Sequence, residues 1–587
     1  MKKLFVTYLF LLTSFCSLKA QTMMFDTESV AEKLSARQTN YFERIQARKK
    51  VDKVYSLSVN PNILHAEKIS FKVGNELVTA YRLKENIRNA ENFSWFGKTT
   101  EGEGVFFYVN NGKVASKFNV GEFSYTLVPL NEGAHSLIRF KDTHIGVCGT
   151  PDVAESNAGR WSQNHKLAND GGCTLRVLVA TTPGARQQIY SSGFDLSTFA
   201  QVAIDEANLA YISSQINVTM ELAALVNTGY TEYTGDKHVT DVTRFRNGTN
   251  GLEITHSARE RYQTDVQVLV RKNESGIYGR AFYIPTVSEP VDGSKAFCTV
   301  SVDGVTNGRF SFTHEVGHLQ GGRHENHSTS PSYARGFLSS NSTNAWRTIM
   351  TRTGAAPCNQ SNSCRTGLFS NPAVAGPGGI PAGTSDRDNA RRINETSLAM
   401  NNLRTSPSTL LLTSETITSE QVSHHLGNSV VDTDNRSIIY QSGSLSTIRA
   451  QDRIILRGGT HIRQGAEFRA YLTGNPCESL PAYIQVQEVI GQNTEDGKYI
   501  GSDLALADEL QLAIYPNPSN GIVNLHFKNV NLSTYNVTIY SMQGGVVFEK
   551  AYSGAETKID VSHLKAGYYF IGIRNDTMKL IRKIIRK

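Results

Sequence analysis

Residues 314–324 read H-E-V-G-H-L-Q-G-G-R-H, and this string constrains the local fold more tightly than any other part of the chain. His314 and His318 are four residues apart, a spacing that places both imidazoles on one face of an α-helix. Gly321 tolerates a positive φ, so the chain can leave the helix sharply and bring His324 back toward the other two. The spacing predicts a helix over about 309–320 whose histidines meet a third histidine from the following turn.

Such a trio of imidazoles is a donor set for zinc. Three neutral imidazoles leave the fourth position of a tetrahedral zinc open, which is typical of a catalytic rather than a structural site. Glu315 follows the first histidine and can reach a water molecule at the open position, where it would act as a general base. We therefore predict one catalytic Zn²⁺ bound by His314, His318 and His324, with Glu315 as the catalytic residue.

The extended string resembles the signature of the metzincin metallopeptidases, whose second mark is a methionine turn beneath the metal. Met350 lies downstream in Thr348-Ile349-Met350-Thr351 and is the candidate for that turn. Residues from about 173 to 404 resemble the bacterial peptidyl-Asp metalloendopeptidases, which are related to the reprolysin-type metzincins. The resembling segments are 177–183, 206–208, 312–314, 346–350, 370–372 and 388–391. The resemblance implies a mixed α/β catalytic domain that hydrolyses peptide bonds.

The chain departs from these relatives just after the methionine. It continues Thr351-Arg352 where relatives often carry Ala-Tyr, so no role of a tyrosine transfers to this site. In the family, this stretch usually walls the pocket for the residue after the scissile bond. A guanidinium pairs with carboxylates in a bidentate manner, which makes Arg352 a candidate for selecting Asp there. The alternative is that Arg352 faces solvent.

The N-terminus has the organisation of a secretory signal peptide. Lys2 and Lys3 precede the apolar run 4–12, and Leu18-Lys19-Ala20 is an acceptable cleavage site. The run is too short for a transmembrane helix, and no later segment is apolar enough for one. The net charge of +7 is concentrated at the ends, with +3 in the signal and +5 in residues 509–587, which leaves −1 between them. The chain therefore has no electrostatic footprint for nucleic acid.

The segment Cys148-Gly149-Thr150-Pro151-Asp152 resembles the cysteine switch of matrix-type metzincin propeptides, in which a thiolate occupies the fourth zinc position. Cys148 is thus a candidate zymogen switch. Val147 stands where an Arg usually precedes the cysteine. With Cys16 lost in the signal, six cysteines remain and can pair completely, so a plain disulfide is an equal alternative for Cys148. Cys358 and Cys364 are the easiest predicted pair.

The chain is long enough for several domains, and we expect a multidomain α+β protein. An amphipathic segment at 30–48 and β-rich sequence, with a turn at Asn111-Gly112, suggest a propeptide. Arg160 and Lys166 are candidate maturation sites. The expected parts are a signal peptide (1–20), a β-rich propeptide (21–165), a metzincin catalytic domain (170–404), a small β-rich module of stacked strands (405–485), a linker (486–509) and a sorting domain (510–587).

Three short motifs mark the C-terminal part, namely 514–521, 564–569 and 579–583. They resemble the C-terminal sorting domain of type IX secretion cargo, a small Ig-like β-sandwich. The resemblance implies the type IX secretion machinery as a partner. It also implies export through the periplasm and outer membrane, followed by release or attachment at the cell surface.

Together these features predict a secreted zinc-dependent endopeptidase that acts on proteins or peptides, is made as a latent precursor, and favours Asp after the scissile bond. The alternative is a cell-surface adhesin or binding protein with a vestigial zinc site. A non-peptide hydrolase that uses the same ligands is a weaker alternative. Structural Ca²⁺ stays open, because no acidic loop in the chain is diagnostic.

Overall fold

The computed structural model describes most of the chain in segments separated by gaps. The described residues are 23–28, 34–89, 91–121, 123–130, 134–141, 147–150, 174–236, 238–274, 276–282, 293–306, 310–327, 331–339, 345–352, 364–404, 406–472, 511–515, 519–528, 534–541, 546–574 and 579–587. The expected signal peptide and linker lie outside them, as do Arg160, Lys166 and Cys358. The chain is a strand-rich α+β protein that divides into two compact units, Met1–Tyr483 and Ile484–Lys587. None of the helices in the described segments is long and apolar enough to span a membrane.

The described part of the N-terminal domain (residues 23–150) contains the α-helix α1 (Ala36–Gln46), a 3-10 helix at Pro61–His65 and an eight-stranded antiparallel sheet of order β1-β8-β7-β6-β5-β4-β3-β2. Its strands are β1 (Val51–Ser58), β2 (Lys68–Val73), β3 (Glu76–Asn89), β4 (Asn92–Thr99), β5 (Gly104–Asn110), β6 (Lys113–Val120), β7 (Phe123–Pro129) and β8 (Ala134–Phe140). The turn predicted at Asn111-Gly112 joins β5 and β6, and both residues have the positive φ that a type I′ turn requires.

Side chains alternate between the two faces along each strand, and this sheet contributes to a hydrophobic core on either face. Trp95 and Phe107 point into a core that belongs to the N-terminal domain alone. Their neighbours Phe96 and Phe106 point the other way, into a second core that includes residues of the central domain. The N-terminal domain therefore shares a hydrophobic core with the domain that follows it.

The central domain (residues 174–404) is built on parallel strands β10 (Thr174–Thr181), β11 (Thr219–Asn227), β12 (Val266–Arg271) and β14 (Phe297–Ser301). Strand β13 (Ile277–Ala281) runs antiparallel to β14. The short strand β9 (Val147–Cys148) of the N-terminal domain adds to β13 in parallel, at the edge of the sheet. The helices are α2 (Pro183–Ser191), α3 (Leu196–Ser213), α4 (Val239–Asn247), α5 (Glu253–Arg261), α6 (Val302–Thr306), α7 (Ser311–Leu319) and α8 (Asn389–Met400).

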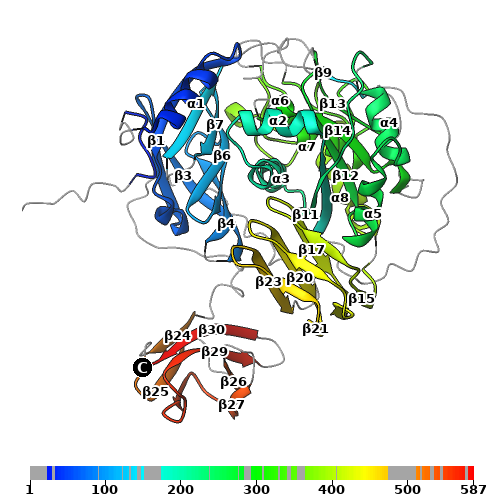
Figure 1. Ribbon diagram of the computed structural model, residues 1–587. Helices are drawn as coiled ribbons and strands as arrows, with labels where there is room; N and C mark the ends of the chain where they lie inside the picture. The colour runs from blue at the N-terminus through cyan, green and yellow to red at the C-terminus, as the bar shows by residue number, and fades with distance from the viewer. Residues whose placement is uncertain are drawn as a thin grey trace, which may run out of the picture. The chain divides into compact units, whose positions relative to one another are not determined.

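Helix α3 lies between the sheets of the N-terminal and central domains (Figure 1). Asp195 caps it, since its side chain accepts a hydrogen bond of 2.7 Å from the Thr198 amide. Of its 18 residues, 17 are buried. A helix that is buried around its whole circumference must pack against other elements on both sides. The N-terminal domain covers one side of α3.

Residues 409–472 form a short parallel β-helix of three turns. The strands of the turns are β15 (Thr409–Leu411), β16 (Glu415–Ile417) and β17 (Val422–Leu426); β18 (Val430–Asp432), β19 (Ile438–Tyr440) and β20 (Leu445–Ala450); and β21 (Arg453–Ile455), β22 (Thr460–Ile462) and β23 (Glu467–Leu472). Each strand pairs in parallel with its equivalent in the next turn. The stacked strands expected in the β-rich module thus form a solenoid.

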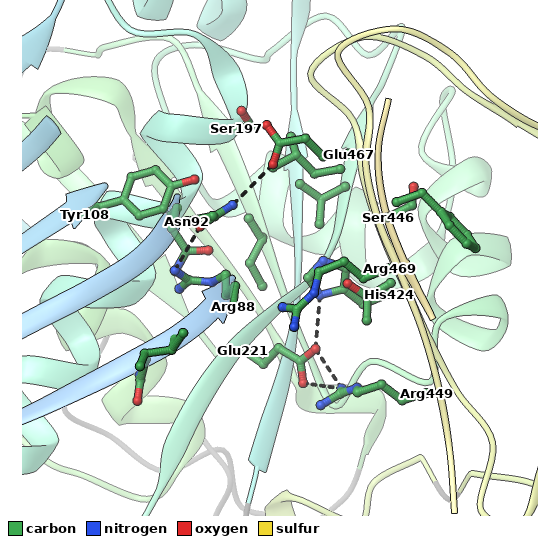
Figure 2. A pocket seen from close by; sticks show the side chains of 18 of the residues that line it. Arg88, Asn92, Tyr108, Ser197, Glu221, His424, Ser446, Arg449, Glu467 and Arg469 are labelled. Atoms are coloured by element: carbon green, nitrogen blue, oxygen red, sulfur yellow. Dashed lines mark hydrogen bonds and ion pairs between the residues drawn. The ribbon is translucent and has the colours of Figure 1, made fainter. Parts of the chain in front are cut away.

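This β-helix continues the central sheet, because β17 pairs antiparallel with β11. A partly buried charge cluster reinforces the junction, as Figure 2 shows for Glu221 beside His424 and Arg449. Glu221 receives hydrogen bonds of 2.6 and 2.7 Å from Arg449 and pairs with Arg176 at 3.2 Å. These cations hold the pKa of Glu221 well below its usual value, against the opposing effect of burial. The β-helix and the central domain therefore form one structural body.

The second unit contains a three-stranded sheet, order β24-β25-β28, and a four-stranded sheet, order β27-β26-β29-β30. The strands are β24 (Gln511–Tyr515), β25 (Ile522–Lys528), β26 (Tyr535–Ser541), β27 (Val546–Tyr552), β28 (Glu556–Asp560), β29 (Gly567–Arg574) and β30 (Lys579–Arg586). All pairings between them are antiparallel, and both sheets contribute to one core. The Ig-like topology expected for this part stays a prediction.

Candidate metal centre and active site

Helix α7 (Ser311–Leu319) carries the first part of the string and lies where the sequence predicts a helix over 309–320. It starts after Phe310, which has a left-handed backbone conformation and accepts the His314 amide at 2.8 Å. Every residue of this helix is buried. At Gly317, a Cβ atom would lie 2.8 Å from the sulfur of Met350, so glycine lets the methionine approach the helix between the two histidines.

The three predicted histidines converge. Their Nε2 atoms are 3.1 Å (His314–His318), 3.1 Å (His318–His324) and 3.2 Å (His314–His324) apart. His314 Nδ1 lies 2.7 Å from the Ile349 carbonyl oxygen and His318 Nδ1 lies 3.0 Å from that of Gly322. A carbonyl only accepts, so each Nδ1 carries the proton and each Nε2 presents a lone pair to the cluster. Converging lone pairs fit a bound cation such as zinc.

The protonation state of the histidines agrees with this donor role. Burial lowers the pKa of His314 and of His318 well below the usual value, and neighbouring positive groups act in the same direction. Neutral imidazoles are the form that binds a metal. The two helical histidines are therefore prepared as ligands by their surroundings.

The turn that returns His324 depends on Gly321, whose φ is +95°. Gly322 donates its amide to the Gly317 carbonyl at 2.8 Å, which closes the helix end. Asn389, at the start of α8, holds the backbone of Arg323, the residue before His324. Its Oδ1 accepts the Arg323 amide at 3.0 Å, and its Nδ2 donates to the Arg323 carbonyl. We assigned Asn389 no role from the sequence, although it lies in one of the resembling segments.

Glu315 is buried beside the histidines. Burial raises the pKa of its carboxyl group to about 7, which is suitable for a group that exchanges protons near neutral pH. Its Oε2 accepts hydrogen bonds from the Thr150 hydroxyl at 3.2 Å and the Cys148 thiol at 3.6 Å. The Thr150 hydroxyl also accepts the Ala281 amide at 2.9 Å, so it bridges Glu315 and strand β13. The sequence placed Thr150 inside the switch segment but indicated no role for it.

Cys148 lies in the histidine cluster and is a free thiol. Its sulfur is 3.6 Å from His318 Nε2, and one ligand atom from each of Cys148, His314, His318 and His324 lies within 4.8 Å of the others. Burial and the adjacent Glu315 carboxylate raise the pKa of the thiol well above its usual value. A thiolate at this position therefore requires a cation beside it, which the three imidazoles are arranged to hold.

Met350 is fully buried beneath the helix that bears the histidines. The carbonyl of the next residue, Thr351, accepts hydrogen bonds from two buried guanidinium groups, Arg347 at 2.9 Å and Arg365 at 3.2 Å. These contacts hold the turn in place under the cluster. Cys364 is disulfide-bonded, and Cys358, its predicted partner, lies outside the described residues.

Arg352 lies at the end of this turn and contacts the carboxylate of Glu325. Its backbone amide donates to Glu325 Oε2 at 3.0 Å, and its side chain pairs with Glu325 Oε1 at 3.4 Å. The Arg352 side chain is 38% exposed, whereas that of Glu325 is 7% exposed. The structure thus brings together the histidines, Glu315, Met350 and Cys148, and it places Arg352 in an ion pair with Glu325.

A His-Glu-x-x-His helix, a third histidine beyond a glycine turn and a methionine beneath them define the metzincin class of zinc metallopeptidases. Residues 173–363 match the model of metallo-peptidase family M12. The chain is 35% identical over 307 residues to a "Peptidyl-Asp metalloendopeptidase" of Stenotrophomonas maltophilia, an alignment that covers 50% of this chain and 69% of that one. The chain belongs to metallopeptidase family M12, among relatives of the bacterial peptidyl-Asp metalloendopeptidases.

A "Peptidyl-Asp metalloendopeptidase" of Xanthomonas campestris pv. campestris is 34% identical over 279 residues, which is 46% of this chain and 62% of that relative. The chain thus spans less than two thirds of the length of this relative. A crystal structure of metalloproteinase-II from Bacteroides fragilis is 11% identical and covers 55% of this chain and 89% of its own, with a TM-score of 0.31, from which we infer nothing.

Residues 513–587 match the secretion system C-terminal sorting domain. The prediction of a sorting domain at this end of the chain is confirmed. The domain indicates export by type IX secretion, so the protein is secreted or attached to the cell surface.

Proposed function

We propose that this protein is a secreted zinc endopeptidase that is made as a latent precursor and prefers Asp after the scissile bond. The observation that carries the proposal is the convergence of three buried imidazole Nε2 atoms beside a buried carboxylate. His314, His318 and His324 would hold one zinc ion, and the Cys148 sulfur would take the fourth position. Structural Ca²⁺ stays open.

Zinc in this donor set supplies a Lewis acid that polarises a carbonyl and makes a water molecule more acidic. Glu315 accepts a proton from the attacking water at its carboxylate and later donates it to the amine that leaves. The raised pKa of Glu315 suits both steps, because burial makes the carboxylate a better proton acceptor than an exposed one. Met350 packs beneath the ligands and takes no part in proton transfer.

The position of β9 supports the proposal of latency. This strand occupies the open edge of the central sheet, next to β13, and places Cys148 within the histidine cluster. Thr150 and Cys148 also engage the Glu315 carboxylate. The same segment thus contacts the sheet edge, the histidine cluster and the Glu315 carboxylate, and in our proposal it must move before a substrate enters. The N-terminal domain would then be the propeptide.

The preference for Asp is suggested by the names of the two relatives. A preference for Asp requires a cation near the pocket for the residue after the scissile bond. Arg352 is the candidate that the sequence indicates. A peptide-library profile of the wild type and of Arg352→Ala tests this role. Loss of acidic preference in the variant is expected if Arg352 selects the substrate.

Casein hydrolysis by the matured protein, with and without a chelator, tests the activity itself. We expect hydrolysis that the chelator abolishes and zinc restores. Glu315→Gln should keep zinc, measured by elemental analysis, and lose roughly 10²- to 10⁴-fold in rate, which is the usual contribution of a general base. Glu395→Gln, on the exposed part of α8, is the matched control. A fully active Glu315→Gln protein would contradict the mechanism.

A cysteine substitution tests latency. The unprocessed Cys148→Ala chain should hydrolyse casein without prior cleavage, because no sulfur then competes for the fourth metal position. Cys298→Ala removes the other free thiol in the described part of the chain and should stay latent. An unprocessed Cys148→Ala chain with no activity would show that the thiol is not the block.

A further inference from the structure

Helix α8 contacts the turn that leads from the two helical histidines to the third one. One buried face of the helix supplies the contacts, and its side chains lie three and four positions apart, namely Asn389, Arg392 and Thr396. The Thr396 hydroxyl donates to the Gln320 carbonyl at 2.7 Å. A Cβ atom at Gly321 would lie 2.6 Å from Arg392 Nε, so the guanidinium packs directly on the glycine. The helix thus follows the turn toward His324.

Asn389 contacts both peptide groups of Arg323, one on each side of that residue. Its Oδ1 accepts the Arg323 amide at 3.0 Å, and its Nδ2 donates to the Arg323 carbonyl at 3.3 Å. The first peptide group also contains the Gly322 carbonyl, which accepts the hydrogen bond from His318 Nδ1 at 3.0 Å. The second also contains the backbone nitrogen of His324. One side chain therefore holds the peptide group that orients His318 and the peptide group that carries His324.

Asn389 is itself fixed by its surroundings. It is fully buried, and its backbone amide donates to the Ser370 hydroxyl at 2.8 Å. That hydroxyl donates in turn to the Arg335 carbonyl at 2.7 Å. Residues 334–336 pair with the Arg323 backbone through two further hydrogen bonds of 2.9 Å. The turn, residues 334–336 and the start of α8 are therefore joined in a closed ring of hydrogen bonds.

The turn needs such an external hold, because two of its residues are glycines, Gly321 and Gly322. Glycine leaves the backbone more conformations than any other residue, so local geometry alone cannot fix the third ligand. His314 has a separate support, since its Nδ1 is oriented by the Ile349 carbonyl of the methionine turn. One ligand is therefore oriented from the methionine turn, and the other two depend on the segment that α8 holds.

We propose that Asn389 is a positioning residue for zinc, which sets His318 and His324 through the peptide groups on either side of Arg323. This inference rests on the proposed zinc site. Contacts that orient metal ligands typically contribute about 10- to 100-fold to metal affinity. The physical reason is that a ligand which is already oriented loses little conformational freedom when the metal binds. Loss of the Asn389 side chain should therefore lower the zinc affinity through these two ligands.

The test measures the zinc affinity of the full chain, in competition with a chelating dye, with and without Asn389→Ala. In the otherwise wild-type chain this substitution should weaken zinc binding by roughly 10- to 100-fold. The same factor should persist in a His314→Ala background, because Asn389 does not act on that ligand. The factor should shrink in His318→Ala and in His324→Ala, where one of the two positioned ligands is already absent. An equal factor in all three backgrounds would indicate a merely structural role and overturn the inference.

Asn394→Ala is the matched control, because Asn394 lies on the same helix and makes the same type of contact elsewhere. Its Oδ1 accepts the Asn217 amide at 2.8 Å, and its Nδ2 donates to the Gln215 carbonyl at 3.3 Å. The zinc affinity should be unchanged in this variant. If Asn389→Ala does not fold, Asn389→Asp, which keeps an acceptor for the Arg323 amide, takes its place in the same comparison of backgrounds.

Two further outcomes decide against the inference in different ways. An unchanged zinc affinity in the Asn389 variant, or an equal loss in Asn394→Ala, overturns the inference and leaves the proposed endopeptidase function intact. A wild-type chain that binds no zinc overturns the proposed function and the inference together.

Discussion

At the scale of residues, the candidate site depends on side chains that are placed by their immediate neighbours. The backbone carbonyls of Ile349 and Gly322 orient His314 and His318, and Asn389 holds the residue before His324. Such contacts fix which nitrogen carries the proton and where the lone pairs point. The ligands are therefore prepared before a metal binds, and substitutions one contact away should affect the site.

Gly317→Ala tests this view. The added Cβ atom would lie 2.8 Å from the Met350 sulfur and 3.0 Å from the Phe369 ring, inside van der Waals contact. We expect a loss of about 1–3 kcal/mol in stability, as for other overpacked cores, together with weaker zinc binding. Gly229→Ala is the control, since nothing lies within 4 Å of its Cβ position. Thermal unfolding and zinc titration of both variants measure the effect, and equal behaviour would rule out tight packing at Gly317.

At the scale of elements, the edge strand β9 links the N-terminal domain to the site. It contains two residues, Val147 and Cys148, and pairs with β13 over Ile277 and Gly279. So short a strand contributes few hydrogen bonds, and Thr150 adds contacts to Ala281 and to Glu315. The hold of residues 147–150 on the site therefore depends on a small number of polar contacts, which is consistent with the proposed release of this segment.

Thr150→Val removes the hydroxyl but keeps the shape of the side chain. The Ala281 amide then loses its buried acceptor and Glu315 loses a donor, at a cost of about 1–3 kcal/mol. We expect measurable casein hydrolysis by the unprocessed variant, intermediate between the wild type and Cys148→Ala. Thr150→Ser, which keeps the hydroxyl, should stay latent. Equal latency of the valine and serine variants would show that the hydroxyl does not hold the segment.

At the scale of the whole molecule, the N-terminal domain completes the core of the central domain. Helix α3 is buried on both sides, and two of its acids have partners in the N-terminal domain. Lys117 pairs with Glu206 at 2.7 Å, and the Ser94 hydroxyl donates to Asp205 at 2.6 Å. Glu206 also accepts the Phe310 amide at the start of α7. Removal of this domain uncovers an apolar helix face and two buried carboxylates.

Cleavage within residues 151–173 should therefore leave the N-terminal domain bound. We expect both fragments to elute together in gel filtration. Lys117→Ala should weaken their association by about 3–5 kcal/mol, because it leaves the buried Glu206 without its cation. Lys113→Ala, at an exposed position on the same strand, should have no effect. Immediate separation of the cleaved wild-type fragments would contradict the idea of a shared core.

The sequence by itself determined the local parts of this protein. The histidine string predicted helix α7 and its turn, because ligand spacing follows from the helical period and from one glycine. The Asn111-Gly112 turn was predictable for the same reason, since it depends on residues that are adjacent in the sequence. The C-terminal sorting domain was predicted from three short motifs, and residues 513–587 match that domain.

Only the tertiary structure determined which side chains meet through contacts between residues far apart in the sequence. Cys148 and Glu315 are 167 residues apart, and pairing between β9 and β13 brings them together, so no local pattern could choose between a switch and a disulfide. The ion pair of Arg352 with Glu325 and the joining of the β-helix to the central sheet have the same origin. Long-range pairing and shared burial are properties of the folded chain, and they determine which of the predicted side chains meet.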